Sequence, residues 1–208
     1  MQVTQPEPAA QVPATAHSNA AVGQIIQFGG YYWRVLDVDG SRALLLSEHI
    51  LFQRNYRDIL LASVALTWEN SDIRHYLNSD FFNRFVPQDR ARIVTTTVIN
   101  NDNPWFGTPG GNSTSDNIFL LSIEEVVRYF GDSGQLVNRP VDNWIHDEYD
   151  NARVARNLQG EARSWWLRSL GNYHLHAVSV HSDGRIIVSG GSKRSNHGVR
   201  PAMWIYLN

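Results

Sequence analysis

The 208-residue sequence contains no cysteine, and this absence removes several functional classes at once. It excludes disulfides, zinc sites built from thiolates and catalysis by a cysteine nucleophile. No run of about 18 apolar residues is present, so no membrane-spanning helix is expected. The formal net charge is only -2, which leaves no basic footprint for nucleic acid and no polybasic patch for membrane insertion. No signal peptide is expected either, because the first residues lack a basic and an apolar region. The sequence does not indicate whether the protein is at the cell surface, in a virion or in the cytoplasm.

Large aromatic side chains are plentiful, with seven Trp, eight Tyr and eight Phe. A chain of this length can bury a substantial core without covalent staples. The first 22 residues are an exception, because they are dominated by Gln, Pro, Ala and Thr and show no period. The sequence therefore predicts a disordered leader or linker over residues 1–22 and one folded domain over residues 23–208.

The first half of the domain predicts a meander of strands followed by helices. Residues 25–28 and 31–36 are expected as strands joined at a Gly-Gly turn, and the apolar run 43–47 as a strand buried on both faces. A helix is expected to begin at Asn70 or Ser71 and to reach Asn78, followed by a short helix over residues 87–94.

The middle of the chain predicts fewer regular elements. Residues 100–117 form a long Gly/Asn/Pro loop in which Trp105-Phe106 is expected to pin the loop to the core or, alternatively, to serve as a ligand platform. A strand is expected over residues 118–121, and a Ser122/Glu125 capping box then opens a helix to Phe130. Residues 131–160 are expected to be irregular, with Trp144 as their anchor.

The last fifth of the chain, from Trp165 to Trp204, has apolar ends and a polar insert rich in Asn, Tyr, His and Ser. Val178/Val180 and Ile186/Val188 alternate with the period of two that strands show. Ser182-Asp183-Gly184 between them favours a hairpin turn. The pattern predicts a hairpin with one core face and one polar face, which is typical of a display surface rather than of a reaction centre.

Three histidines in this insert have a spacing that metal ligands can have. On a strand, His174 and His176 would point to the same side, with His181 nearby. Only Asp183 accompanies them, and the turn explains that residue. We expect exposed polar side chains and no metal, with a metal-dependent enzyme using His174, His176 and His181 as the alternative.

Two further patterns have structural explanations. Gly131-Asp132-Ser133-Gly134 has the letters of a serine-protease nucleophile motif, but it follows a predicted helix and no matching His motif lies upstream. We expect a helix cap and turn glycines there. Arg168 and Arg200 flank the polar insert in apolar surroundings, and we expect carboxylates or carbonyls to clamp their guanidinium groups, with the binding of an anionic ligand as the alternative.

Five motifs in order carry a resemblance that covers about residues 23–208. They are residues 28–36 (FGGYYWRVL), 67–78 (TWENSDIRHYLN), 118–122 (IFLLS), 166–169 (WLRS) and 198–202 (GVRPA). The series resembles a bacterial and phage domain family of uncharacterised function with a C-type lectin-like fold, akin to that of the formylglycine-generating enzyme. The resemblance implies an α+β protein with mixed small antiparallel sheets, two or three short helices and long loops.

In some members of that family, the segment between the WLRS and GVRPA motifs is the variable region of a diversity-generating retroelement, which mutates adenines through an error-prone reverse transcriptase. Asn codons of the AAY type then yield residues such as Asn, Tyr, His, Ser and Asp. The insert has this composition, although loops in general favour Asn, Ser and Gly. The expected ligand-binding surface is Asn172, Tyr173, His174, His176, Ser179, His181, Ser189, Ser192, Arg194, Ser195, Asn196 and His197. The expected structural frame is Trp165, Trp166, Arg168, Gly184, Gly198, Arg200, Pro201 and Trp204.

The sequence departs from the enzymes and lectins that share the fold. Those enzymes use a cysteine pair or an iron-binding His triad, and neither pattern is present; Glu-Pro-Asn and Trp-Asn-Asp calcium motifs are also missing. The resulting hypothesis is a non-enzymatic binding protein without catalytic residues, metal or cofactor, whose partner is a protein or cell-surface ligand and not nucleic acid. An invariant structural module of a surface or virion assembly is a further alternative. The oligomeric state is not indicated.

Overall fold

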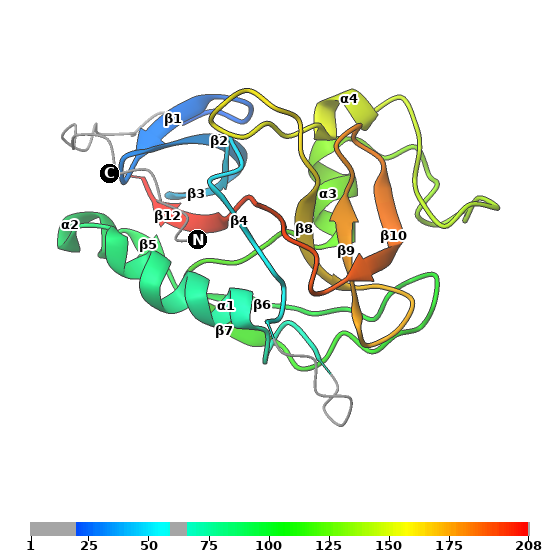
Figure 1. Ribbon diagram of the computed structural model, residues 1–208. Helices are drawn as coiled ribbons and strands as arrows, with labels where there is room; N and C mark the ends of the chain where they lie inside the picture. Colours follow the sequence, from blue (N-terminus) through cyan, green and yellow to red (C-terminus); the bar gives the residue numbers. More distant parts are fainter. Residues whose placement is uncertain (1–19, 59–65, 208) are drawn as a thin grey trace.

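The protein is α+β, with several small sheets and a few short helices, in a computed structural model that describes residues 20–58 and 66–207. The first 19 positions of the leader expected over residues 1–22 lie outside the described residues. Two five-stranded sheets lie side by side, with a helical band along one edge of the first (Figure 1). No helix in the described residues is long and apolar enough to cross a membrane.

The first sheet contains both ends of the described chain in the order β1-β2-β3-β12-β5. Its strands are β1 (Ile25–Phe28), β2 (Tyr31–Asp39), β3 (Arg42–Ser47), β12 (Ala202–Tyr206) and β5 (Ile93–Val94). All of its pairings are antiparallel. The predicted Gly-Gly turn joins β1 to β2, and β3 is buried on both faces as expected.

The second sheet holds the polar insert in the order β10-β9-β8-β11-β4. Its strands are β8 (Trp165–Leu170), β9 (His176–Val180), β10 (Ile186–Ser192), β11 (His197–Val199) and β4 (Phe52–Arg54). The predicted hairpin is β9–β10, and the sheet is mixed because β11 pairs parallel to β8. A third, two-stranded ribbon consists of β6 (Thr96–Val98) and β7 (Thr114–Asp116).

The first predicted helix begins as expected and its helical residues continue beyond Asn78, whereas the second helix ends sooner than expected. Ser71 caps α1 (Asp72–Tyr76), which continues through η1 (Leu77–Phe81) and η2 (Phe82–Arg84). The next helix, α2, is Pro87–Arg90, so the prediction of a helix to residue 94 was wrong. Ile93 and Val94 instead pair with Ile205 and Trp204 of β12, because two β-branched residues fit the open edge of the sheet.

Two predictions for the middle of the chain need correction. Residues 118–121 are buried but form no strand of their own; Phe119 alone bridges Ala202 with two hydrogen bonds of 2.9 and 2.7 Å. Residues 131–160 contain one short helix, α4 (Asp150–Arg153). Their anchor is Ile145, which is 1% exposed and pairs with Ile186, whereas Trp144 is half-buried.

The helix predicted after Ser122 is confirmed as α3 (Ile123–Phe130). Both hydrogen bonds of the capping box are present, and Gly131 caps the other end. The helix packs on β8, so the segment that leads into the polar insert rests on a properly capped helix. The core contains the four fully buried tryptophans Trp33, Trp68, Trp165 and Trp166.

Candidate functional site

The loop that connects β8 to β9 forms the exposed end of the polar insert. Asn172, Tyr173 and His174 are exposed there, and Tyr173 shows 43% of its surface to solvent. The Tyr173 ring lies 4.2 Å from the His176 ring and 5.7 Å from the His174 ring. Nδ1 of His176 lies 2.9 Å from Oδ1 of Asn172. The Tyr173 ring thus lies near both imidazole rings, and the Asn172 amide lies near the ring of His176.

Backbone hydrogen bonds hold this loop on the sheet. The N–H of Asn172 donates to the Ser189 carbonyl at 2.8 Å, and the N–H of Gly171 donates to the His176 carbonyl at 2.9 Å. A Cβ on Gly171 would lie 2.3 Å from the same Ser189 carbonyl oxygen, so the loop base is as close to β10 as glycine allows. The side chains of the loop can therefore differ without changing its attachment.

A second loop reaches the same end of the sheet. The amide of Asn103 donates to the carbonyls of Leu170, at the end of β8, and Val188, within β10, at 2.7 and 3.0 Å. Trp105 is 9% exposed, and its indole N–H donates to the Leu136 carbonyl at 2.8 Å, so it pins the loop. Phe106 is half-buried, and the Arg139 guanidinium lies over its ring at 4.5 Å. Phe106 and Arg139 therefore flank the β8–β9 loop.

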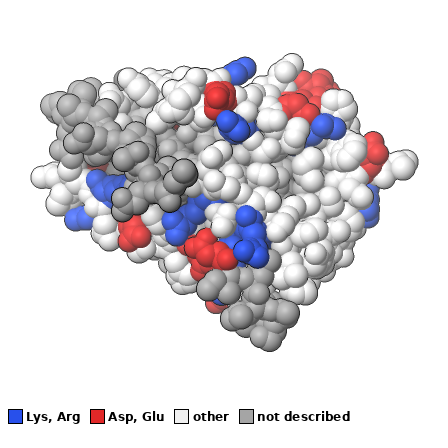
Figure 2. All heavy atoms as spheres, in the orientation of Figure 1, with Lys and Arg blue, Asp and Glu red and all other residues white. Residues whose placement is uncertain are grey.

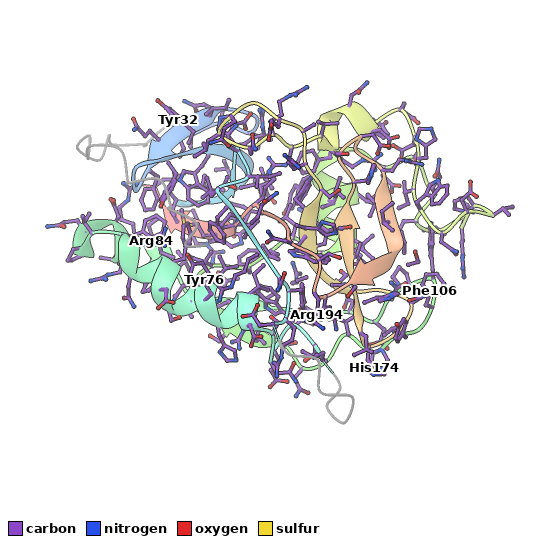
Figure 3. The ribbon with its side chains drawn as sticks, in the orientation of Figure 1. Tyr32, Tyr76, Arg84, Phe106, His174 and Arg194 are labelled. Carbon is purple, nitrogen blue, oxygen red and sulfur yellow. The ribbon has the colours of Figure 1, made fainter. Side chains whose placement is uncertain are left out.

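Figure 3 shows His174, Arg194 and Phe106 toward the same lower edge of the second sheet, whereas Tyr32 and Arg84 lie on the other half of the molecule. Ser192 pairs with His176 across β9 and β10, and Arg194, like Ser192 and Asn196, is exposed. Ser189 and Ser195 are half-buried. The structure thus brings most of the expected surface residues to this end.

Two expected residues lie at the opposite end of β9. His181 follows the last residue of β9, and its Nδ1 lies 2.9 Å from Oδ1 of Asp183. Burial would raise the pKa of Asp183, but hydrogen bonds from Arg185 and His181 outweigh it and hold the pKa well below its usual range. His197 packs on Trp166 with ring centroids 4.3 Å apart, and burial followed by the nearby charge of His181 lowers its pKa.

The histidine spacing does not produce a shared site. At about 3.3 Å per residue, the length of β9 separates His176 from His181 by roughly 16 Å. His174 precedes the strand, so the expected alternation between His174 and His176 on one strand face does not apply. Among the described residues, no group of three or more His, Cys, Asp or Glu side chains is placed to hold a metal ion.

Ser179 was expected on the exposed surface, and that expectation is wrong. It is 4% exposed in the middle of β9, where it pairs with Trp166 on one side and Ile187 on the other. The prediction of a hairpin with one polar face fails for the same reason: residues 177–180 are all buried, because other elements cover both faces of β9.

The two arginines of the frame have the contacts that a structural role requires. Both Nη atoms of Arg168 bind the Glu125 carboxylate, and they also donate to the carbonyls of Leu120 at 2.7 Å and Ile99 at 3.1 Å. Arg200 donates to the Ser47 carbonyl at 3.1 Å and lies 4.9 Å from the Trp165 ring centre. Burial lowers the pKa of Arg200 to about 10.

The other frame residues contact elements of both sheets. Trp165 donates its indole N–H to the Arg153 carbonyl at 3.1 Å, and Trp166 donates to the Arg54 carbonyl at 2.9 Å. A Cβ on Gly198 would lie 2.7 Å from Ile50. The Pro201 carbonyl accepts from the Ser47 N–H at 2.9 Å, and Arg42 lies over the ring of the half-buried Trp204.

Lys193 is the residue that the sequence analysis missed. It is fully buried, and its ammonium donates to the carbonyls of Leu66 and His174, each at 2.6 Å. Burial, followed by the nearby charge of Arg57, lowers the pKa of Lys193 from 10.5 to about 7. One signal was available, because Lys193 is the only lysine in a sequence that otherwise uses Arg for every basic side chain.

A cleft of about 340 Å³ is lined by residues outside the polar insert. Glu48, His49, Asn151, Val154 and Arg156 line it, between the β3–β4 connection and the segment around α4. The sequence patterns did not single out any of these residues.

Comparison with known proteins places the chain in a family. Residues 40–207 match the model of a family described as "Domain of unknown function (DUF6273)". The chain belongs to the DUF6273 family. The matched residues include the whole polar insert and its frame, from β3 to the end of β12. A search of the curated proteins and a search of the solved structures found no match.

Proposed function

We propose that this DUF6273 protein is a non-enzymatic binding protein that displays the β8–β9 loop and its surroundings to a protein or cell-surface ligand. The observation that carries the proposal is the contrast within residues 171–176. Asn172, Tyr173 and His174 are exposed, while the backbone of the same loop is hydrogen-bonded to a buried sheet. A rigid base with adaptable side chains is the arrangement that binding loops of antibodies use.

The chemistry of the exposed groups supports a binding role. Tyr offers a large amphipathic ring with few rotatable bonds, and Asn, Ser and His offer hydrogen-bond donors and acceptors. Phe106 with its stacked Arg139 extends the aromatic area at the flank. On the face drawn in Figure 2, basic and acidic side chains of the described residues are interspersed and form no broad area of one sign. Recognition through aromatic and amide groups therefore fits this surface better than recognition through net charge.

The proposed surface is smaller than the one that the sequence suggests. It consists of residues of the β8–β9 loop, the β10–β11 turn and the adjoining parts of β9 and β10, namely Asn172, Tyr173, His174, His176, Ser189, Ser192, Arg194, Ser195 and Asn196. We call this set the display surface. Ser179 is excluded because it is buried, and His181 and His197 are excluded because they lie toward the other end of the sheet.

We further propose that the two small sheets and short helices form a C-type lectin-like fold, and that the protein is the variable protein of a diversity-generating retroelement. Two features support this: the order of the five motifs and the composition of the display surface. The test is to sequence the gene and its flanking DNA from many sibling cells or phages. Differences confined to adenines in codons of the display surface, with a template repeat and a reverse transcriptase gene nearby, would support it. A uniform sequence without a repeat would contradict it.

Binding itself is tested with a double variant, Tyr173→Ala with His174→Ala. The immobilised wild-type domain is screened against surface proteins and whole bacterial cells, and each ligand that binds is measured against the variant. We expect at least a tenfold loss of affinity, about 1.4 kcal/mol, with an unchanged melting temperature. Tyr32→Ala is the matched control, because Tyr32 is 55% exposed on the first sheet. Equal binding by wild type and double variant would contradict the proposal.

The alternative of a metal-dependent enzyme has no geometric support of its own, because His181 lies far from His174 and His176. Stoichiometric zinc or iron in protein purified without an affinity tag would be the observation that revives it. The alternative of an invariant structural module predicts a uniform gene sequence and no loss of assembly in the double variant.

A further inference from the structure

Lys193 joins three segments that are distant in the sequence. Its amine Nζ donates to the His174 carbonyl in the β8–β9 loop and to the Leu66 carbonyl, and it lies 5.5 Å from the ring centre of Tyr56. Its backbone repeats the connection: the Lys193 N–H donates to the Leu175 carbonyl at 3.2 Å, and its carbonyl accepts from the Arg57 N–H at 3.0 Å. One residue thus attaches the display surface to the body of the domain.

Among the described residues, the titratable groups near the Lys193 amine are neutral or basic. Tyr56 and Arg57 face it from one segment and His176 from the β8–β9 loop; Arg168 lies behind Tyr56, and Arg194 follows it in the chain. Lys193 forms no ion pair with any residue that the structure describes. Burial raises the pKa of the Tyr56 hydroxyl, so Tyr56 supplies no negative charge.

Protonation therefore conflicts with burial at this position. Burial, followed by the charge of the Arg57 guanidinium, lowers the pKa of Lys193 below that of a lysine in water, while its two carbonyl acceptors and the Tyr56 ring act in the opposite direction. The pKa of His176, the first residue of β9, is lowered in the same way by burial and by the charge of Lys193, against an opposing hydrogen bond that its ring donates to the Ser189 backbone.

We propose that Lys193 is a proton-sensitive latch on the β8–β9 loop, which holds the loop against the Leu66 carbonyl when the amine is neutral and releases it when the amine is protonated. The latch concerns the free protein and does not depend on any ligand. Its consequence for binding, a weaker display surface at lower pH, rests on the proposed function.

The direction and range follow from linkage. The pKa of Lys193 is about 7 with the loop attached and 10.5 for a lysine in water. Because the released state binds the proton more tightly, each unit of pH decrease between these values shifts the balance about tenfold toward release. Below about pH 7 both states are protonated, so the shift ends there.

Hydrogen exchange measured by mass spectrometry tests the latch without a ligand. The amides of Gly171, Asn172 and His176 are followed from about pH 6 to pH 9, and each rate is divided by the intrinsic rate at that pH. We expect their protection to be flat below about pH 7 and then to rise by up to tenfold per pH unit. The turn of residues 157–160 serves as the control. Its Gly160 amide donates to the Asn157 carbonyl, and its protection is expected to show no such rise.

Two variants separate the latch from other causes. Lys193→Gln keeps a hydrogen-bond donor that does not titrate, and Lys193→Met removes the donor altogether. Both are expected to lose the rise in protection, while Arg194→Gln, which changes the exposed neighbouring cation, keeps it. A flat wild-type profile, or the same rise in the Lys193 variants, would overturn the proposal. If neither variant folds, the wild-type protein tests the proposal by itself, through the pH dependence of protection in the β8–β9 loop compared with that in the turn of residues 157–160.

The outcomes for latch and function are distinguishable. A rise in loop protection in the wild type, together with unchanged binding by the Tyr173→Ala, His174→Ala variant, would support the latch and contradict the proposed function. A flat profile with a large loss of binding in that variant would do the reverse.

Discussion

Arg168 and Glu125 form the ion pair that ties strand β8 to helix α3 at the entrance to the polar insert. Glu125 performs two tasks, because its Oε2 also accepts from the Ser122 N–H at 2.9 Å in the capping box. Arg168 is 5% exposed, so its charge depends on this carboxylate and on the carbonyls of Leu120 and Ile99. One carboxylate thus caps the helix and neutralises the frame arginine.

Replacing Glu125 with Ala is expected to destabilise the protein by about 3 kcal/mol, because it leaves the Arg168 charge buried without its partner and opens the helix cap. Urea unfolding measures the effect. Glu124→Ala is the control, since it removes the preceding carboxylate of the same helix turn and leaves the pair intact; we expect less than about 1 kcal/mol. Equal effects of the two substitutions would contradict the role given to Glu125.

Gly184 is expected to tolerate no side chain. Its φ is +96°, and a Cβ would lie 1.8 Å from the Asp150 carbonyl oxygen of α4. Gly184→Ala should therefore cost at least about 2 kcal/mol of folding free energy, through both backbone strain and the collision. Gly191→Ala on β10 is the control, because nothing lies within 4 Å of its Cβ. Similar melting temperatures for the two variants would show that the turn can move away from α4.

The boundary of the display surface predicts which positions accept a large side chain. Ser179→Tyr is expected to cost more than about 3 kcal/mol or to prevent folding, because the strand is buried on both faces. Asn172→Tyr is expected to change the unfolding free energy by less than about 1 kcal/mol, since the side chain is exposed. Thermal unfolding of the two purified variants measures this. A folded, stable Ser179→Tyr protein would contradict the exclusion of Ser179 from the display surface.

Lys193 predicts a pH dependence of global stability as well. Its pKa is about 7 in the folded chain and 10.5 when solvated, so the unfolded state binds more protons between these values and stability rises with pH. Relative to Lys193→Met, the wild type should gain about 1.4 kcal/mol per pH unit above about pH 7 and nothing below it. Urea unfolding of both proteins from about pH 6 to pH 9 gives this difference directly. A constant difference would mean that the buried amine keeps its proton throughout.

The local patterns of the sequence determined the elements that depend on neighbouring residues alone. Ser122 and Glu125 specify the start of α3 because a capping box needs only one helix turn. Gly29-Gly30 and Ser182-Asp183-Gly184 specify their turns through backbone conformation, and the apolar run of β3 specifies its burial. The contacts of Arg168 and Arg200 follow from the same logic, since a buried guanidinium requires acceptors.

Only the tertiary structure decided which polar residues are exposed and which are near one another. Ser179 and Ser192 have the same side chain, yet one is buried between β8 and β10 and the other is exposed, because burial depends on which elements cover a strand. His176 and His181 are five positions apart in the sequence but lie at opposite ends of β9. Lys193 meets Leu66 across 127 positions, a contact that no local pattern encodes. The composition of the insert predicts a binding surface, and the packing of distant segments decides which of its residues are exposed.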